Sequence, residues 1–350
     1  MDSSASSRMR RWLLAGIVVL TVTVAAACTS GVSAGSGKGT SDSSVPLQDS
    51  YESVVRAVLP SVVQITAGSS TGSGVVFDGQ GDIVTNEHVV GDATSAEVRD
   101  SVGNMDLTAK VIGRFAPDDL AVIRVNKDAS SLKPAKFVNS NDAQIGEIVL
   151  AMGNPLGLTD SVTQGIISAT GRTVGASEPG GQALITAAIQ TSAAINPGNS
   201  GGALVNLEDE VIGIPTLAAR LPEEGGGAAP GIGFAIPSDT VMNIANQLIK
   251  SGKVTNSDRA TLDITAQTVA SPQGEPTGVA VLAATQGGAA AKAGLEAGDI
   301  IVSVNGENTP SVQDLQDVLS VLKPGEKVSL VYTDNGVRHT ATAKLGSLGS

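Results

Sequence analysis

Short apolar runs rich in valine and isoleucine alternate with turns that contain glycine, asparagine or proline between residues 61 and 236. Runs of about four to eight β-branched residues between such turns are typical of strands. We predict strands at residues 61–67, 74–77, 83–85, 120–125, 148–152, 165–169, 202–205 and 211–214. Many short strands in succession favour antiparallel barrels or a sandwich, so this part of the chain is expected to be mostly β.

Helical spacing of apolar residues occurs on both sides of this β-rich part. Residues 51–60 carry apolar side chains three and four positions apart and end at a proline. Residues 238–251 form a second amphipathic pattern, with Ser238 as the expected N-cap and Gly252 directly after the end. The apolar face of this second helix consists of Val241, Ile244, Ala245, Leu248 and Ile249. The polar residues 253–259 are predicted to link two domains.

Residues 260–346 contain a further set of strands and a helix of their own. Strands are expected near residues 279–283, 299–304, 327–332 and 338–343. The helix is expected to start at Ser311, because Asp314 stands three positions later, as a capping box requires. Its apolar face consists of Val312, Leu315, Val318, Leu319 and Leu322. This pattern predicts a separate core and a small α+β domain.

The first 28 residues have the pattern of a targeting segment. Arg8, Arg10 and Arg11 precede the apolar run 12–27, which ends in small residues before Cys28. Such an ending looks like a bacterial lipoprotein signal, which would be cleaved and leave Cys28 lipidated. An uncleaved anchor is the alternative, although the run is somewhat shorter than the ~20 residues that span a bilayer comfortably. Either interpretation places the body of the protein outside the cytoplasm, attached to the membrane, and a secreted form is a further alternative.

Composition excludes some classes of partner and some kinds of chemical site. Residues 29–50 are rich in serine, glycine and threonine with almost nothing to bury, which predicts a disordered tether. The formal net charge of −12 argues against nucleic acid as a partner, because a basic footprint is missing. The single cysteine excludes an intramolecular disulfide and a zinc–thiolate cluster, and no cofactor or metal is expected.

Ser200 lies in the glycine-rich run 196–202 and is the candidate nucleophile. Glycines allow the backbone to approach a substrate closely and to direct N–H groups towards it. We therefore expect the turn of Gly198, Asn199 and Ser200 to form an oxyanion hole, with the amides of Gly198 and Ser200 as donors. The alternative is an ordinary serine in a turn between two strands.

An activated serine needs a base and an acid that orients the base. The chain has two histidines, and His88 is the candidate base because His339 lies in a polar terminal strand and is expected to face solvent. Asp119 directly precedes the apolar run 120–125, where it is expected to accept from the imidazole. Its neighbour Asp118 is the competing candidate, and one of the two is expected to be a solvated turn carboxylate. A metal site at His88 and the preceding glutamate lacks a second nearby histidine or cysteine.

Four segments in the same order give a more specific resemblance. Residues 85–89, 119–123, 153–157 and 194–202 resemble the HtrA/Deg family, which consists of chymotrypsin-like serine proteases with C-terminal PDZ domains. The resemblance covers residues 51–346. It implies two perpendicular β-barrels at residues 51–252, with a catalytic triad of His88, Asp119 and Ser200 in the cleft between them.

The resemblance also implies how the protease would bind its substrates. Ile232, Gly233 and Phe234 would lie beside the substrate backbone, and Ile195 near the primary pocket, which in this family prefers small aliphatic side chains. Ser192 departs from the family, where aspartate is usual, and a supporting hydrogen bond near the pocket is expected to weaken. Unfolded or misfolded polypeptides are the expected substrates, and a homotrimer is the assembly that the family suggests.

The last domain resembles a PDZ domain, which binds a peptide as an added strand between its second strand and its helix. Leu262, Asp263 and Ile264 would form the carboxylate-binding loop of this groove, with Val318 on the helix. Asp263 stands where the family has glycine. Its side chain is expected either to repel a C-terminal carboxylate or to point into solvent without effect.

Two functions remain open from the sequence. The first is an extracytoplasmic serine endopeptidase for protein quality control in the cell envelope under stress, regulated by its PDZ domain. The second is a chaperone or scaffold that binds polypeptides and has weak or absent catalysis. The presence of all three triad residue types favours the enzyme.

Overall fold

The computed structural model describes residues 46–100, 106–126, 129–154, 161–178, 181–196, 198–221 and 227–349. The predictions for the targeting segment, for lipidation of Cys28 and for the tether up to residue 45 lie outside these residues. Among the helices described, none combines the length and the apolar composition that a membrane crossing needs.

Helix α1 (Pro46–Val58) precedes the first strand and starts earlier than the apolar spacing predicts. Proline suits the first helical position, since its missing N–H would have no partner there, and Ser50 Oγ donates to the Pro46 carbonyl (2.9 Å). Val54 and Val58 are buried. The last five positions of the predicted tether, 46–50, are therefore helical.

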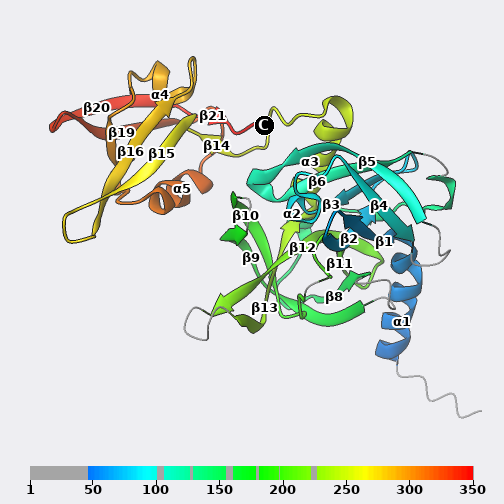
Figure 1. Ribbon diagram of the computed structural model, residues 1–350. Coiled ribbons are helices and arrows are strands. Elements are labelled where there is room, and N and C mark those ends of the chain that lie inside the picture. The colour runs from blue at the N-terminus through cyan, green and yellow to red at the C-terminus, as the bar shows by residue number, and fades with distance from the viewer. Residues whose placement is uncertain are drawn as a thin grey trace, which may run out of the picture. The chain divides into compact units, whose positions relative to one another are not determined.

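Six antiparallel strands close into the first barrel (Figure 1). They are β1 (Val62–Ala67), β2 (Ser70–Val76), β3 (Asp82–Thr85), β4 (Ser95–Asp100), β5 (Asp106–Phe115) and β6 (Leu120–Val125). Their order around the barrel is β1-β2-β3-β6-β5-β4. The apolar runs predict β1, β2, β3 and β6, but not β4 and β5. These two strands alternate exposed and buried positions, so they lack the continuous valine-rich runs that mark the others.

The second barrel is also six-stranded and follows in the sequence. Its strands are β8 (Ile148–Gly153), β9 (Ser161–Glu178), β10 (Gly181–Thr191), β11 (Ala203–Val205), β12 (Glu210–Leu221) and β13 (Gly227–Pro237). The order is β11-β8-β9-β10-β13-β12, and a β11–β12 pairing closes it. The short strand β7 (Lys136–Phe137) adds to β12 in parallel. The expectation of a mostly β chain with barrels is confirmed.

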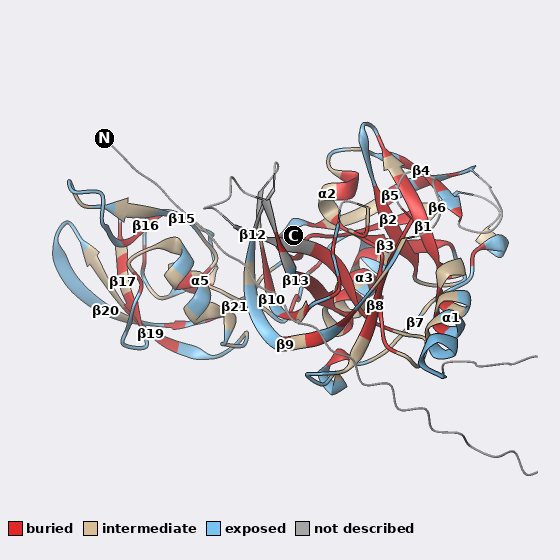
Figure 2. Cartoon of the chain, turned by 90° about the horizontal axis from the view of Figure 1, so that it is seen from below, coloured by how far each residue is buried: buried red, intermediate tan, exposed pale blue. Residues whose placement is uncertain are grey.

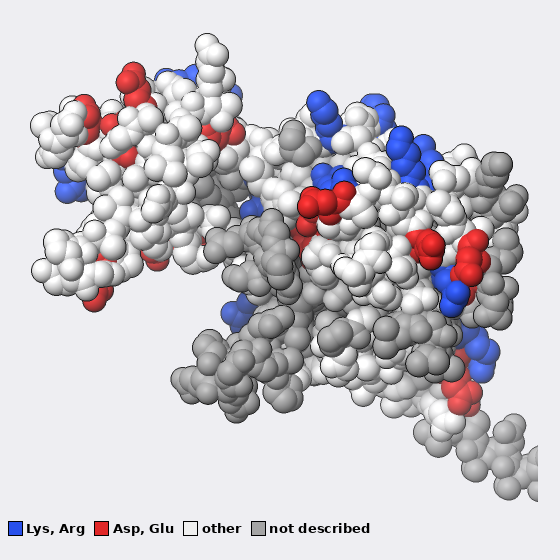
Figure 3. Space-filling view, in the orientation of Figure 1, with Lys and Arg blue, Asp and Glu red and all other residues white. Residues whose placement is uncertain are grey.

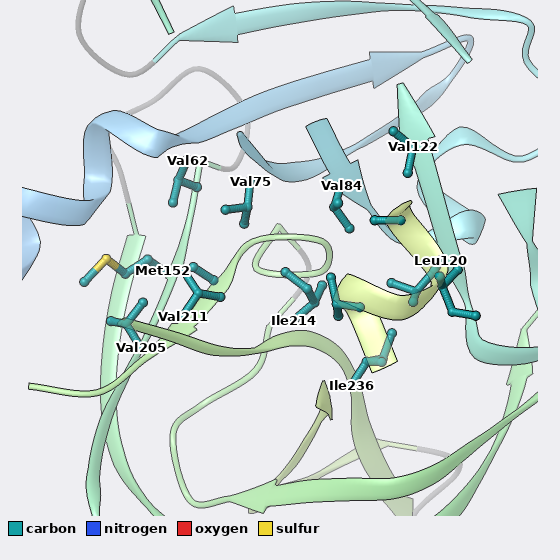
Figure 4. Packing of buried hydrophobic residues seen from close by; sticks show 14 of the residues in the cluster. Val62, Val75, Val84, Leu120, Val122, Met152, Val205, Val211, Ile214 and Ile236 are labelled. Atoms are coloured by element: carbon teal, nitrogen blue, oxygen red, sulfur yellow. The ribbon is translucent and has the colours of Figure 1, made fainter. Parts of the chain in front are cut away.

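One apolar cluster joins the two barrels, which are among the most buried parts of the chain (Figure 2). Figure 4 shows side chains of both barrels converging in it. From the first barrel come Val62, Val75, Val84, Leu120 and Val122, and from the second come Met152, Val205, Val211, Ile214 and Ile236. Burying this surface stabilises the contact between the barrels, so residues at its edge are held in fixed positions.

Helix α3 (Ser238–Ser251) places its predicted apolar face in the same cluster. Gly252 ends the helix with a left-handed backbone (φ 69°), as predicted. The predicted N-cap is wrong: Pro237 occupies that position, and the Ser238 hydroxyl donates to the Val138 carbonyl instead. Short 3₁₀ turns occur at η1 (Leu59–Ser61), η2 (Ala116–Asp118), η3 (Ala129–Ser131) and η4 (Ser140–Asp142).

The C-terminal part has its own core, as the sequence predicts. Its main sheet contains β15 (Ile264–Ala270), β16 (Pro276–Ala284), β17 (Ile300–Val304), β18 (Glu307–Asn308), β19 (Lys327–Asp334) and β20 (Val337–Lys344). Two shorter strands, β14 (Ala260–Thr261) and β21 (Gly346–Ser347), pair separately. Its helices are α4 (Ala289–Lys292) and α5 (Val312–Ser320), and α5 begins with the predicted capping box of Ser311 and Asp314.

Candidate active site

Pairing between β3 and β6 brings His88 and Asp119 together. Thr85 at the end of β3 pairs with Ala121 near the start of β6, and Asp119 directly precedes that strand. The chain turns after β3 into the one-turn helix α2 (Glu87–Val90), so His88 lies on a helical turn rather than at a strand end. The antiparallel register thus fixes the distance between two residues that are far apart in sequence.

The Asp119 carboxylate binds both the ring and the backbone of His88. Its two oxygens lie 2.8 and 3.0 Å from His88 Nδ1, and the His88 backbone N–H donates to Oδ1 (3.0 Å). An ionised carboxylate can only accept, so we assign the ring proton to Nδ1, which leaves the lone pair on Nε2. Asp119 is only 4% exposed, which keeps water from competing for these bonds.

Further contacts hold Asp119 itself in place. Its backbone is left-handed (φ 51°), a conformation that aspartate tolerates better than most residues. Its carbonyl accepts from Asn86 Nδ2 (3.0 Å) and from the Glu87 N–H (3.1 Å). From the second barrel, Thr216 Oγ1 donates to Asp119 Oδ2 (2.5 Å). The sequence reasoning missed Asn86 and Thr216; for Thr216 no local signal exists, because its partner is 97 positions away.

Ser200 ends a tight turn just before β11, in contact with both barrels. Its hydroxyl donates to the Thr216 carbonyl (3.4 Å), and its own carbonyl accepts from the Ser73 N–H (2.9 Å). The next residue, Gly201, has φ 80°, and a Cβ there would lie 2.2 Å from the Ser73 carbonyl oxygen. Thr216 therefore contacts both Ser200 and Asp119, and the three predicted triad residues gather at the junction of the barrels.

The turn before Ser200 is shaped by the backbone of Gly198 and by hydrogen bonds of Asn199. Gly198 adopts φ 110°, which only glycine reaches without strain. The Asn199 N–H donates to the Asn196 carbonyl (3.0 Å) and its side chain to the Ala194 carbonyl (3.2 Å). Asn199 thus stabilises the turn, and the amides of Gly198 and Ser200 remain the predicted oxyanion donors.

The expectation that Asp118 or Asp119 would be a solvated turn carboxylate is wrong, because both are buried. Asp118 is 1% exposed and forms an ion pair with Arg259 (2.6 Å), whose guanidinium also donates to the Pro117 carbonyl. Burial raises the pKa of Asp118, and the Arg259 charge opposes that shift. Burial likewise raises the pKa of Glu87. In the described ranges, no group of three or more potential metal ligands occurs.

The predicted substrate-binding residues lie on β13 and on the segment before the Ser200 turn. Gly233 faces Ile195, and a Cβ on Gly233 would lie 2.4 Å from Ile195 Cγ1. Phe234 is buried and Ile232 is exposed. Ser192 Oγ accepts from the Ile166 N–H (3.0 Å), so the residue that departs from the family pattern still forms a supporting bond.

The C-terminal domain has a groove between β15 and α5. Its walls within this domain include Leu262, Ile264 and Ala266 on one side and Val312, Leu315 and Leu319 on the other. Val318 packs against the domain core and does not line the groove. Asp263 also lies outside it: its backbone is left-handed (φ 57°), and its carboxylate accepts from the Ala289 N–H (3.0 Å). The side chain is therefore neither in the groove nor free in solvent.

His339 is exposed on β20, as predicted, and stacks on Tyr332.

The double barrel with His88, Asp119 and Ser200 at its junction is the fold of trypsin-like serine proteases, and an α+β domain with its own core follows it. Residues 72–214 match the trypsin-like peptidase domain family, and residues 281–333 match the PDZ domain family. A DegP-like periplasmic serine endoprotease of Pseudomonas savastanoi pv. phaseolicola is 40% identical over 285 residues, which is 80% of this chain and 56% of that protein. This chain thus spans about half the length of the curated relatives it matches.

Solved structures agree with this assignment. The serine endoprotease from Yersinia pestis is 36% identical, with a TM-score of 0.58 over 85% of this chain and 98% of that one. The HtrA-type protease AlgW with a bound tripeptide is 32% identical, with a TM-score of 0.57 over 85% of this chain and 96% of that one. The chain belongs to the HtrA family of serine proteases.

Proposed function

We propose that this protein is a serine endopeptidase that cleaves unfolded or misfolded polypeptides outside the cytoplasm. The observation that carries the proposal is the Asp119 carboxylate, which binds His88 Nδ1 (2.8 Å) and Thr216 Oγ1 (2.5 Å) while Thr216 also contacts Ser200. A buried carboxylate that orients an imidazole beside a serine is the arrangement that hydroxyl activation needs.

The chemistry follows from the tautomer of His88. With Nδ1–H held by Asp119, the Nε2 lone pair accepts the Ser200 hydroxyl proton as Oγ attacks the scissile carbonyl carbon. The imidazolium then gives that proton to the leaving amine, and an acyl-enzyme remains. A water molecule repeats the two steps and releases the acid. Asp119 stays ionised throughout and stabilises the positive ring. The Gly198 and Ser200 amides would bind the oxyanion at each step.

The substrate class follows from the site and from the second domain. An extended polypeptide would lie along β13 at Ile232 and Gly233, and the apolar surroundings of Ile195 favour small aliphatic side chains. Figure 3 shows that the charged side chains drawn in that view lie in separate groups, with other described residues between them. The groove beside α5 would bind a peptide as an added strand to β15 and so regulate the protease.

The proposal extends to an exported, membrane-attached protein that assembles as a homotrimer. The relatives are described as periplasmic, and the N-terminal pattern of this chain is that of an export signal. Attachment to the membrane through Cys28 rests on that pattern, and a homotrimer rests on the family resemblance. Protein quality control in the envelope is the role that fits an exported endopeptidase for unfolded chains.

A fluorophosphonate probe separates this proposal from the alternative of a chaperone or scaffold. We expect the folded wild-type protein to form a covalent adduct and the denatured protein to form none, because only the assembled triad makes the Ser200 oxygen nucleophilic. The measurement is the intact mass after labelling, with and without a PDZ-binding peptide and an unfolded substrate. A folded protein that stays unlabelled under all these conditions would favour the binding function.

Replacing Thr216 with valine is expected to lower kcat about tenfold with little change in KM. The change keeps the shape but removes the hydroxyl that donates to Asp119 Oδ2 (2.5 Å), a charge-assisted bond worth about 1.5–3 kcal/mol. Steady-state cleavage of a chromogenic peptide measures the effect. Thr216→Ser restores the donor and should restore kcat; equal kcat in the valine and serine variants would contradict the role.

A further inference from the structure

Ser73 is a buried residue of β2 that contacts the Ser200 turn from the opposite barrel. It has no exposed surface. Its backbone N–H donates to the Ser200 carbonyl (2.9 Å), and its own carbonyl accepts from Thr85 Oγ1 (2.7 Å). Its hydroxyl donates to the Gly198 carbonyl (2.5 Å) and accepts from the Asn154 N–H (2.8 Å). Every polar atom of this serine therefore has a partner in or beside the site.

The direction of the Ser73 hydroxyl bond is set by its two partners. An amide N–H can only donate, so the Asn154 bond uses a lone pair of the Ser73 oxygen. The single hydroxyl proton is left for the Gly198 carbonyl, which can only accept. A side chain without both capacities would leave a buried N–H or a buried carbonyl unpaired, at a cost of about 1–3 kcal/mol for each group.

Close packing leaves the Ser200 turn little freedom to move around this contact. A Cβ on Gly201 would lie 2.2 Å from the Ser73 carbonyl oxygen. A Cβ on Gly72 would lie 3.4 Å from the Ser200 carbonyl oxygen. The two backbones therefore meet directly, and the Ser73 hydroxyl is the side-chain link between β2 and Gly198.

We propose that Ser73 is a positioning residue for the oxyanion hole, a role that rests on the proposed function of Ser200. Gly198 at φ 110° lacks the side chain that would restrict its rotation, so its amide is free to turn unless the residue is held elsewhere. The Ser73 hydroxyl donates to the Gly198 carbonyl, and the Asn199 N–H of the same peptide donates to the Asn196 carbonyl. With this peptide held at both ends, rotation at Gly198 is limited, and its N–H, which belongs to the preceding peptide, keeps its direction towards the developing oxyanion.

Ser73→Ala tests this role against the matched control Ser140→Ala. Ser140 is a buried serine whose hydroxyl also donates, to Asp239 Oδ2 (2.7 Å), and accepts, from the Asp239 N–H (3.3 Å), outside the proposed site. Losing one oxyanion donor costs about 10²–10³-fold in kcat, so a loosened donor should cost about 10–100-fold. We expect that fall in kcat for Ser73→Ala, with KM within about twofold, and no such fall for Ser140→Ala at a comparable loss of unfolding temperature.

A peptide boronate gives a second readout, because its tetrahedral adduct places an oxygen in the oxyanion hole. Its inhibition constant should rise for Ser73→Ala by the same factor as kcat/KM falls, as expected for a transition-state analogue. The affinity of the Ser200→Ala variant for a peptide should be the same as that of the double variant that also carries Ser73→Ala. Ser73→Thr keeps the hydroxyl and should retain more activity than Ser73→Ala.

The outcomes distinguish this inference from the proposed function. If Ser200→Ala keeps its activity, the proposed function fails first. If Ser200→Ala is inactive while Ser73→Ala matches Ser140→Ala in kcat and boronate affinity, only the role of Ser73 is overturned. Should Ser73→Ala not fold, Ser73→Cys keeps a side-chain donor at this position, a weaker one on a somewhat larger atom. The kcat of Ser73→Cys must then fall by a larger factor than the kcat of Ser140→Cys, or the inference is wrong.

Discussion

Replacing Ser200 with alanine is expected to abolish fluorophosphonate labelling and to lower peptide-bond cleavage by about 10⁴–10⁶-fold. The substitution removes the hydroxyl that contacts the Thr216 carbonyl, and it removes little volume from a turn in which Gly201 packs against the Ser73 carbonyl. The fold should therefore persist. Cleavage of unfolded casein and intact mass after labelling measure the loss.

Binding of a peptide to the PDZ domain is the internal control for this variant. The core of the C-terminal domain consists of residues of that domain alone, so the affinity of its groove beside α5 should be unchanged in Ser200→Ala. Fluorescence anisotropy of a labelled peptide measures it. Labelling of Ser200→Ala at the wild-type rate would show that another residue is the nucleophile.

Features encoded within a few residues of each other were predictable from the sequence. The helix at residues 238–251 and the capping box of Ser311 and Asp314 depend on spacing and on side chains within one turn. The strands β4 and β5 were not predictable in the same way, because their exposed faces interrupt the apolar pattern.

Contacts between distant segments account for the rest. Ser238 has the residue type of an N-cap, but the Val138 carbonyl, 100 positions away, takes its hydroxyl. Asp118 has the sequence surroundings of a solvated carboxylate, but Arg259 approaches it across 141 positions. The three predicted triad residues were singled out by their local motifs, whereas Thr216 and Ser73 contact the candidate site through partners that no local pattern reveals.

Replacing Asp119 with asparagine is expected to lower kcat by about 10⁴-fold while leaving the fold intact. Asparagine has nearly the same shape, but an NH₂ group would replace either Oδ1, which accepts from the His88 backbone N–H, or Oδ2, which accepts from Thr216 Oγ1. Both positions lie within 3.0 Å of His88 Nδ1. Its NH₂ group would then face His88 Nδ1 and donate to it. That bond favours the tautomer with the proton on Nε2, which can no longer accept from Ser200. Steady-state cleavage and the rate of fluorophosphonate labelling should fall together.

Asp118→Asn is the matched control, one position away and equally buried. Its carboxylate contacts Arg259 and not His88, so kcat should stay within about threefold of the wild type. Stability should respond instead. Burial raises the folded-state pKa of Asp118 above its ordinary 3.8, so the folded protein holds this proton to higher pH than the unfolded chain does.

The pH dependence of the free energy of unfolding gives the Asp118→Asn control a measurement of its own. Between the unfolded and the folded pKa of Asp118, the free energy of unfolding falls as pH rises, and above both values the cost of the buried charge is fully present. In urea unfolding measured from about pH 3.5 upwards, the free energy of unfolding of Asp118→Asn should not show this fall. The range begins near the ordinary pKa of an aspartate, about 3.8. If Asp118→Asn and not Asp119→Asn abolished cleavage, the acid of the triad would be Asp118. The 2.8 Å contact between Asp119 and His88 would then have to be purely structural.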